Sequence, residues 1–586
     1  MKRPFLLTFL LFLLTLVFFA QIGSAQIARD QEREDPKVER DNANARAQYE
    51  LLRQHDPATG EIPNGIRAQE LAFASHLPVR AHGISLTQPG FKNGATTLTS
   101  TQWNLRGPYN IGGRTRALAI DVSNPNVILA GGVSGGMWRS SDTGSTWVKT
   151  TADDDLLSVT CVAQDTRPGK TNVWYYGTGE FAGSSANAVG ANYFGNGIFK
   201  STDDGQTWNI LPSTDPGNPK IFDQPFDYVF NIVPDPYNMS FDILYAATVD
   251  GIHRSTNGGA TWSTVLGKDT SNSAYTDVAV THTGVIYAAL STNGRGVGTA
   301  PINGIYRSTD GISWTNITPA GWPGYTGAIS IALAPSNENS LYVIANTGGA
   351  GPSGHAFWKY SYISGDGSGS GGTWTDRSSN LPNTPFFNQN FIFDSQNGYD
   401  LYVHVKPDNE NIVYIGGIEL YRSTDGLSST LHTQMVGSEL TNNFHVDQHA
   451  LAFSPTNPGV MFAGNDGGVF ETQNDLASTM QWRSLNNGYY TTQFYTAALD
   501  HANAGNPIII GGMQDNGTIF TGSVNATNPW SNLLSGDGSY CAIANGRSAY
   551  YMSYQNGVIY RTYVDDSGSV STPSFARLDP LNGTGY

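Results

Sequence analysis

Acidic side chains recur at one place in the repeating pattern of this chain, in the loop after the second apolar run of a repeat. Five repeats carry such an acid: Glu180, Asp250, Glu419, Asp466 and Asp515. Hydrolysis of a glycosidic bond needs two carboxyl groups, one as acid and one as base or nucleophile. Asp466 and Asp515 are the candidate catalytic pair, because their loops belong to consecutive repeats, while Glu180 and Asp250 are candidate binding residues. Asp-Gly and Asn-Gly pairs are also favoured turn residues, so the same pattern is compatible with a purely structural role.

A second polar group lies in the segment 444–450, where His445, Asp447 and His449 alternate with other residues. Side chains at i and i+2 share one face of a β-strand, so these three point the same way if the segment is a strand. Two imidazoles and a carboxylate can bind a divalent metal, and they can equally form a hydrogen-bonded polar rim. We expect a rim that contacts ligand, with no metal and no cofactor.

Arg114 stands in a glycine-rich segment, residues 112–116, just before the first apolar run. A guanidinium group can bind a carboxylate through two parallel hydrogen bonds. Arg114 is therefore a further candidate binding residue, expected where the apolar runs begin.

An eight-residue motif, Ser-x-Asp-x-Gly-x-Thr-Trp, recurs along the chain and must help to position these residues. Its Ser and Asp are expected to bond the backbone of a tight turn, its Gly to take a positive φ, and its Trp to pack beneath the hairpin. Two copies are complete, a third has Asn for Asp, and a fourth is one residue short. The Asp or Asn and the Trp of the four copies are Asp142 and Trp147, Asp203 and Trp208, Asn257 and Trp262, and Asp310 and Trp314.

Around each motif the chain follows one order: an apolar run, a turn, a second apolar run, a Gly-rich loop, an aromatic run and a final short run. This order predicts four antiparallel strands per unit, and nine units can be read. A single sheet of this size leaves faces and edges unprotected, so we expect the units to stack around an axis as the blades of an all-β propeller. Nine blades fit one large ring or two smaller rings.

The motif resembles the Asp-box (BNR) repeat of sialidases, sortilin-type receptors and xyloglucanases. The segments 110–116 and 131–138 also look like the first blade of exported bacterial sortilin-type and xyloglucanase-type repeat proteins. In the xyloglucanases the corresponding loop reads Thr-Asp-x-Gly-Gly and its Asp is catalytic, whereas Ser134 stands at this place here. The loop Asn465-Asp466-Gly467-Gly468 reproduces the pattern in a later unit, which makes Asp466 the first choice if the protein is an enzyme.

The N-terminal region differs in composition from the repeats. Residues 1–25 are predicted to be a secretory signal peptide, because a basic start is followed by an apolar run and a small-residue cleavage site. Residues 26–82 are a charged extension that is either helical or flexible, with a short helix expected near 66–77. Residues 83–101 are a Ser/Thr/Gly-rich linker, and residues 102–586 form the repeat region. These features predict a secreted or cell-surface protein.

The composition of the chain limits the classes of molecule that the protein is expected to bind. The formal net charge of −16 makes nucleic acid or an anionic membrane surface a poor partner, and no later segment is long enough for a transmembrane anchor. The two cysteines fall in different units and have no metal-site spacing. We expect an extracellular recognition module for glycans or protein segments, of undetermined oligomeric state. The alternative is a xyloglucanase-like glycoside hydrolase with a two-carboxylate mechanism.

Overall fold

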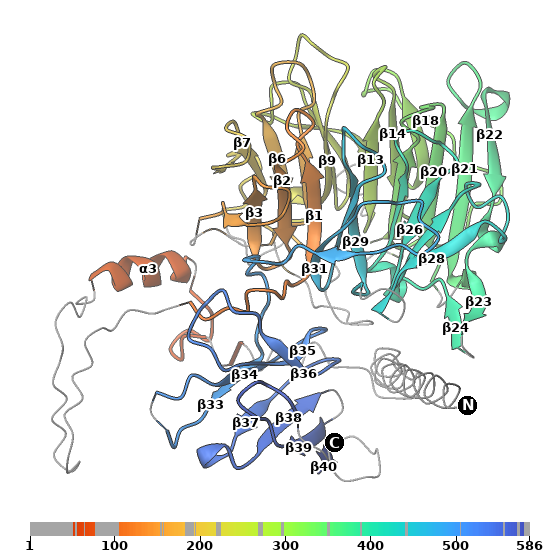
Figure 1. Ribbon diagram of the computed structural model, residues 1–586. Coiled ribbons are helices and arrows are strands. Elements are labelled where there is room, and N and C mark those ends of the chain that lie inside the picture. The colour runs from red at the N-terminus through yellow and green to blue at the C-terminus, as the bar shows by residue number, and fades with distance from the viewer. Residues whose placement is uncertain are drawn as a thin grey trace, which may run out of the picture.

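The computed structural model describes residues 51–52, 55–63, 65–76, 105–152, 155, 158–181, 193, 195–217, 224–267, 273–294, 298–348, 352–386, 389–439, 444–503, 505–554, 557–570 and 575–578. The expected signal peptide, the linker 83–101 and most of the extension 26–82 lie outside these residues. Helix α3 (Ile66–His76) forms where the sequence predicts a short helix, and Figure 1 shows it apart from the sheets. Among the described residues, no helix has the length and hydropathy needed to cross a membrane.

Nine four-stranded antiparallel sheets, each built from strands that follow one another in the chain, confirm the predicted all-β propeller architecture. The strands of the first three sheets are β1 (Thr115–Ile120), β2 (Ile128–Gly132), β3 (Gly136–Ser140), β4 (Val148–Lys149), β5 (Cys161–Gln164), β6 (Trp174–Gly177), β7 (Ile198–Ser201), β8 (Asn209–Ile210), β9 (Val229–Pro234), β10 (Leu244–Thr248), β11 (Gly251–Ser255) and β12 (Ser263–Gly267). Those of the fourth to sixth sheets are β13 (Thr276–Val280), β14 (Ile286–Leu290), β17 (Gly304–Ser308), β18 (Thr315–Asn316), β19 (Ile329–Leu333), β20 (Ser340–Asn346), β21 (His355–Tyr362), β22 (Gly372–Asp376), β25 (Tyr402–Val405), β26 (Val413–Gly416), β27 (Leu420–Ser423) and β28 (Thr433–Gly437).

The last three sheets complete the series, and two short hairpins are inserted in the loops. The strands of these sheets are β29 (Gln448–Phe453), β30 (Met461–Asn465), β31 (Gly468–Thr472), β32 (Arg483–Ser484), β33 (Thr496–Leu499), β34 (Ile509–Met513), β35 (Gly517–Thr521), β36 (Ser531–Leu534), β37 (Cys541–Ile543), β38 (Tyr550–Tyr554), β39 (Val558–Thr562) and β40 (Ala576–Arg577). The hairpins pair β15 (Asn293–Gly294) with β16 (Gly298–Thr299) and β23 (Asn383–Phe386) with β24 (Gln389–Ile392). The 3₁₀ turns are η1 (Pro225–Asp227), η2 (Pro352–Gly354), η3 (Gly369–Gly371), η4 (Ser378–Asn380), η5 (Gln396–Gly398) and η6 (Asn545–Arg547).

The nine sheets do not form one ring. The first strands of seven sheets lie side by side in a closed circle, in the order β1, β5, β9, β13, β19, β25, β29 and back to β1. The eighth and ninth sheets lie outside this circle, with β33 against β37, and Figure 1 shows them below the ring. The described residues therefore form a seven-bladed ring with two further sheets, which differs from both the single large ring and the two smaller rings that the sequence left open.

The core of the ring lies between neighbouring sheets. Every residue of the second strands β2, β10 and β14 is buried, because each sheet is covered on both faces by its neighbours. Cys161 and Cys541 are both free thiols, and they lie in the first strands of the second and ninth sheets.

The motif turns have the predicted hydrogen bonds. The Ser140 hydroxyl donates to Asp142 Oδ1 at 2.8 Å, and the Thr146 amide donates to the same oxygen at 2.8 Å. Asp203, Asn257 and Asp310 accept corresponding bonds in their own turns.

The motif tryptophans differ from the prediction, because each is shared between two sheets instead of lying beneath its own hairpin alone. Trp147 packs among residues of the first and seventh sheets, and its Nε1 donates to the Leu485 carbonyl at 2.7 Å. Trp208, Trp262 and Trp314 occupy the equivalent places between later pairs of sheets. Each motif tryptophan therefore contributes to the packing between its own sheet and the preceding sheet of the ring.

The segment before β1 contacts the eighth sheet and so joins it to the ring. The Arg106 guanidinium donates to the Pro507 carbonyl at 2.6 Å, and Trp530 Nε1 donates to the Arg106 carbonyl at 2.9 Å. The Asn110 side chain accepts a bond from the Trp530 amide at 2.8 Å. These contacts bring the β34–β35 turn towards the end of the ring where β1 begins.

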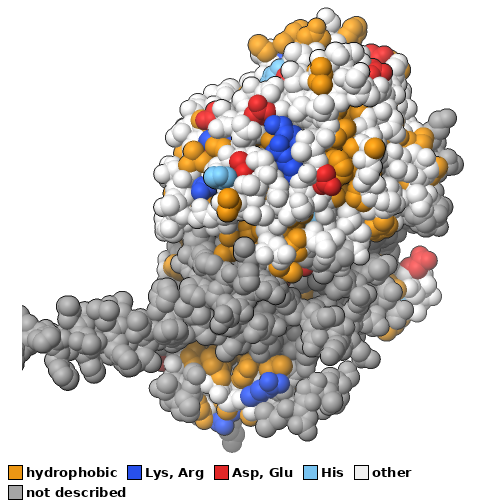
Figure 2. All heavy atoms as spheres, turned by 90° about the vertical axis from the view of Figure 1, so that its right-hand side faces the viewer, with side chains coloured by type: hydrophobic (Ala, Val, Ile, Leu, Met, Phe, Trp, Pro, Cys, Tyr) orange, Lys and Arg blue, Asp and Glu red, His pale blue; other side chains and the backbone are white. Residues whose placement is uncertain are grey.

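Figure 2 shows how charged side chains are distributed over one face of the described residues. On the face shown in Figure 2, Lys and Arg side chains lie in small groups among uncharged ones, without a continuous basic surface.

Candidate functional site

An ion pair joins the first sheet to the seventh. Arg114 Nε donates to Asp466 Oδ1 at 2.8 Å and to Oδ2 at 2.9 Å, and its Nη2 also contacts Oδ2. The Asp466 side chain is 1% exposed and that of Arg114 is 12% exposed. The predicted two-pronged contact of Arg114 with a carboxylate is therefore present, and its acceptor is the acid that the loop pattern singled out.

The turn between β30 and β31 aims Asp466 into this site. Gly468 has a φ of +108°, and a Cβ there would lie 2.1 Å from the Asn486 side chain. Asn486 closes the turn by donating to the Gly467 carbonyl at 2.7 Å and accepting from the Val469 amide at 2.9 Å. The glycines therefore allow a close backbone approach that fixes the direction of the preceding Asp.

His449, which lies on β29, also contacts Asp466. Its Nε2 donates to Asp466 Oδ1 at 2.7 Å and lies 3.7 Å from Asp400 Oδ1. Burial lowers the pKa of His449 to about 4, so the ring is neutral at pH 7 and its proton resides on Nε2. His449 thus supplies a hydrogen bond to Asp466 and no full charge.

Asp447 is placed differently from the prediction. Strand β29 begins at Gln448, so His445 and Asp447 precede the strand and the three side chains do not share one strand face. Asp447 has a left-handed φ of +62° and accepts a hydrogen bond from Gln396 Nε2 at 2.7 Å. His445 turns towards the eighth sheet, where its Nε2 lies 3.1 Å from the Asp515 carbonyl.

Asp515 reaches the same site from the β34–β35 turn. Arg114 Nη2 donates to Asp515 Oδ2 at 3.3 Å, and the side chain of Asp515 is 16% exposed. Asn516, the next residue, donates to the Asp466 carbonyl at 3.0 Å. The two acids chosen from the sequence are therefore neighbours in space, one from the ring and one from the sheets outside it.

The acids of this cluster have opposed proton affinities. Burial favours the neutral form of Asp466, yet Arg114 and His449 together hold the pKa of its carboxyl well below the usual range. Burial and the nearby Asp537 and Asp466 charges raise the pKa of Asp515 well above the usual range. Burial also raises the pKa values of Asp400 and Asp447. One ionised carboxylate is thus surrounded by acids that favour the protonated form.

Glu180 lies beside this cluster and Asp250 does not. Glu180 Oε1 accepts from Arg116 Nη1 at 2.5 Å and from the Tyr399 hydroxyl at 2.6 Å. The Tyr399 ring lies under the guanidinium carbons of Arg114 and Arg116, at 5.0 Å and 4.7 Å from its centroid. Asp250 lies in the turn between β10 and β11, three sheets round the ring from Asp466.

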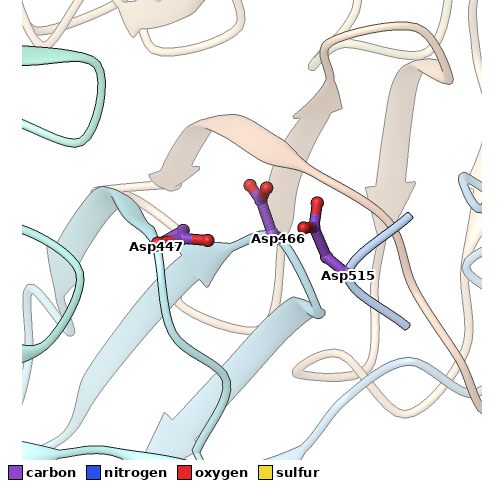
Figure 3. A group of neighbouring side chains, drawn as sticks. All are labelled: Asp447, Asp466 and Asp515. Atoms are coloured by element: carbon purple, nitrogen blue, oxygen red, sulfur yellow. The ribbon is translucent and has the colours of Figure 1, made fainter. Parts of the chain in front are cut away.

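The carboxyl groups of Asp447, Asp466 and Asp515 each offer an oxygen, and these oxygens lie within 4.8 Å of one another (Figure 3). Oxygen donors suit a hard cation such as Ca²⁺ or Mg²⁺. Arg114, however, already donates to both oxygens of Asp466 and to one of Asp515. A guanidinium in this place supplies the positive charge and would repel a cation, so the arrangement does not fit a metal ion.

Sequence reasoning missed Asp400, Tyr399, Gln396 and Asp537 as members of this site. Asp400 lies two residues before β25 and Asp447 one residue before β29, so a search for acids just before the first strands would have included Asp400. Asp537 lies in a Gly-Asp-Gly segment that is typical of a turn, and nothing in its neighbourhood in the sequence points to this site.

Comparisons with known proteins place this chain near xyloglucanases. A xyloglucanase from Paenibacillus sp is 28% identical over 258 residues, which is 39% of this chain and 24% of that protein. A xyloglucanase from Acetivibrio thermocellus is 29% identical over 179 residues, 26% of this chain and 20% of that protein. The matches span a quarter or less of these curated relatives. No family model matches the chain.

Solved structures share the fold. The GH74 enzyme of Niastella koreensis superposes with a TM-score of 0.55 at 18% identity, over 82% of this chain and 68% of that one. The GH74 xyloglucanase of Xanthomonas campestris gives a TM-score of 0.50 at 17% identity, over 82% and 76% of the two chains. At 17–18% sequence identity, the similarity to these solved structures establishes the β-propeller fold of this chain alone.

Proposed function

We propose that this protein is an exported glycoside hydrolase that cleaves a β-glucan of the xyloglucan class, with Asp466 and Asp515 as its two carboxyl groups. The observation that carries the proposal is the opposed proton affinity of these neighbours, since hydrolysis needs one ionised and one protonated carboxyl group. The similarity to xyloglucanases supports the choice of substrate. The N-terminal sequence supports export.

In this proposal Asp515 is the general acid. Its raised pKa keeps the proton at neutral pH, and its side chain is the most exposed of the three central carboxyl groups. It donates the proton to the glycosidic oxygen as the bond to the anomeric carbon breaks. Asp466, kept ionised by Arg114, stabilises the positive charge at that carbon and acts as base or nucleophile. The anomeric configuration of the first product distinguishes these two roles.

A second candidate function is glycan binding without catalysis. Both oxygens of Asp466 are occupied by Arg114, and Nη2 of the same guanidinium contacts Asp466 and Asp515, so it fills the space between the two carboxyl groups. Ser134 also stands where the xyloglucanases have a catalytic Asp. Hydrolysis would require the turn that carries Asp515 to withdraw from Asp466 when substrate enters.

The two functions are separated by assaying hydrolysis and binding on the same variants. We expect release of reducing ends from xyloglucan, lost at least about a hundredfold in Asp515→Asn and Asp466→Asn, because general acid–base groups contribute about 10²–10⁴-fold. Asp250→Asn is the matched control, since it removes a turn acid of the same ring away from the site. Binding of xyloglucan without any reducing-end release by the unaltered protein would favour the second candidate.

A further inference from the structure

Tyr399 contacts both side chains that donate hydrogen bonds to the Asp466 carboxylate, and the proposed mechanism gives it no role. Its ring lies against the Arg114 guanidinium, with 5.0 Å between the ring centroid and the guanidinium carbon. The same ring meets the His449 ring edge to face, with 5.3 Å between the two centroids. Arg114 belongs to the start of the first sheet and His449 to the seventh, so one aromatic side chain packs against both donors at the closure of the ring.

Tyr399 is itself held in place by residues other than Asp466 and its donors. Its hydroxyl donates to Glu180 Oε1 at 2.6 Å, and its carbonyl accepts from Arg116 Nη2 at 3.2 Å. Arg116 also lies over the ring, with its guanidinium carbon 4.7 Å from the centroid, and it pairs with Glu180. The position of the ring is therefore fixed from the second sheet, where Glu180 follows β6.

The Arg114 guanidinium has more than one carboxylate within reach. Its Nη2 contacts Asp515 as well as Asp466, so rotation of the side chain could exchange the two-pronged contact for one with Asp515. A guanidinium group over an aromatic face is attracted by the electron density of the ring, and more strongly where water is excluded. A fixed ring at this place therefore favours the orientation of Arg114 in which both Asp466 oxygens accept.

We propose that Tyr399 is a positioning residue that holds Arg114 and His449 on the Asp466 carboxylate. The proposal rests on the proposed function for the use of Asp466 as base or nucleophile, whereas the positioning of Arg114 is a separate claim. Tyr399 acts through its ring, so Tyr399→Phe should keep the role and lose only the bond to Glu180. Tyr399→Leu should lose the role.

A double-mutant cycle in the full chain tests the positioning of Arg114 without reference to activity. Tyr399→Leu and Arg114→Gln are compared alone and together by denaturant unfolding, with circular dichroism as the check of folding. We expect the double variant to be less destabilised than the sum of the two single variants, because each substitution breaks the same contact. Tyr362→Leu is the matched control, since the Tyr362 ring lies over Arg307 at 4.3 Å, and its effect should add to that of Arg114→Gln.

The consequence for catalysis is read from the pH profile of kcat/KM on xyloglucan. Asp466 must be ionised to act, and a displaced Arg114 would favour the ionised form less, so the acid limb should move to higher pH in Tyr399→Leu. On that limb, kcat/KM should fall about threefold to tenfold more than on the plateau. The other charged groups around Asp466 and Tyr399 are unchanged in this variant: Asp400, Asp447, Asp515, Arg116 and Glu180.

The outcomes separate the positioning role from the proposed function. Tyr399→Phe and Tyr362→Leu should both leave the acid limb in place. Additive effects in the Tyr399→Leu cycle overturn the positioning of Arg114, whether or not glucan is hydrolysed. An unmoved acid limb with a raised KM also overturns it, and would mean that the Tyr399 ring contacts substrate. A coupled cycle in a protein that releases no reducing ends supports the positioning of Arg114 and contradicts the proposed function alone.

Discussion

Arg114 and Asp466 are 352 positions apart in the chain, and they form a two-pronged ion pair at the place where the first sheet meets the seventh. This ion pair therefore helps to close the ring of sheets, and it also forms part of the candidate site. His449 bonds the Asp466 side chain and Asp515 bonds that of Arg114, so a change in one of these four residues alters the electrostatics of the others.

Replacement of Arg114 by Gln should lower the free energy of unfolding by about 3–5 kcal/mol, because it leaves the buried Asp466 carboxylate without its charge partner. Denaturant unfolding measures this change. Lys170→Gln is the control, since Lys170 and its partner Asp242 are 43% and 38% exposed, and Asp242 keeps its pairing with Arg167. The control should change stability by less than about 1 kcal/mol. Equal effects in both variants would mean that the Arg114 pair contributes no more than a surface contact.

Replacement of Asp400 by Asn should stabilise the protein at neutral pH. Asp400 is fully buried, and no donor among the described residues bonds its oxygens, so burial raises its pKa well above the usual value. The folded state then keeps a proton that the unfolded chain has lost above about pH 3.9, and stability falls as pH rises towards the folded-state pKa. Each pH unit in that window costs about 1.4 kcal/mol, which the neutral Asn avoids.

Thermal unfolding of Asp400→Asn and of the unaltered protein, measured between pH 4 and 7, checks the predicted direction of this stability change. The difference in melting temperature should grow with pH. Asp408→Asn, which removes a side chain that is 54% exposed, should show a difference that does not grow in this way. A difference that shrinks with pH would mean that Asp400 is ionised in the folded protein.

Replacement of Trp147 by Ala should destabilise the ring by about 3–5 kcal/mol, the usual cost of removing a buried aromatic side chain. Trp147 is 7% exposed and packs between the first and seventh sheets. Trp147→Phe keeps an aromatic ring and loses the bond to the Leu485 carbonyl, so its cost should be nearer about 1 kcal/mol. A change below about 1 kcal/mol in the Ala variant would contradict a role in ring closure.

Deletion of residues 26–95 should leave the melting temperature of the sheets nearly unchanged. The described part of this extension buries little apolar surface, since Leu52 is 69% exposed and Phe73 on α3 is 66% exposed. The contacts that join the ring to the outer sheets begin at Arg106 and stay intact. Unfolding of the truncated chain would show that the extension completes the propeller.

The sequence by itself determined the repeating unit of this protein. Strand alternation and turn residues are local, so the four strands of each unit and the bonds of Asp142 in its turn could be predicted from neighbouring residues. The choice of Asp466 and Asp515 also came from a local pattern, the acid in a Gly-rich turn. The sequence could not assign their roles, because their proton affinities depend on which side chains surround them.

Tertiary structure decided the number of sheets in the ring and the membership of the site. Nine similar units are compatible with several rings, and only the packing of β29 against β1 closes the circle after seven. That closure brings Arg114 to Asp466, and the position of the outer sheets brings Asp515 and Asp537 to the same place. Contacts between residues hundreds of positions apart produce no recurring sequence pattern. Hydrogen bonds within a turn do, because the few residues that form them recur as a motif.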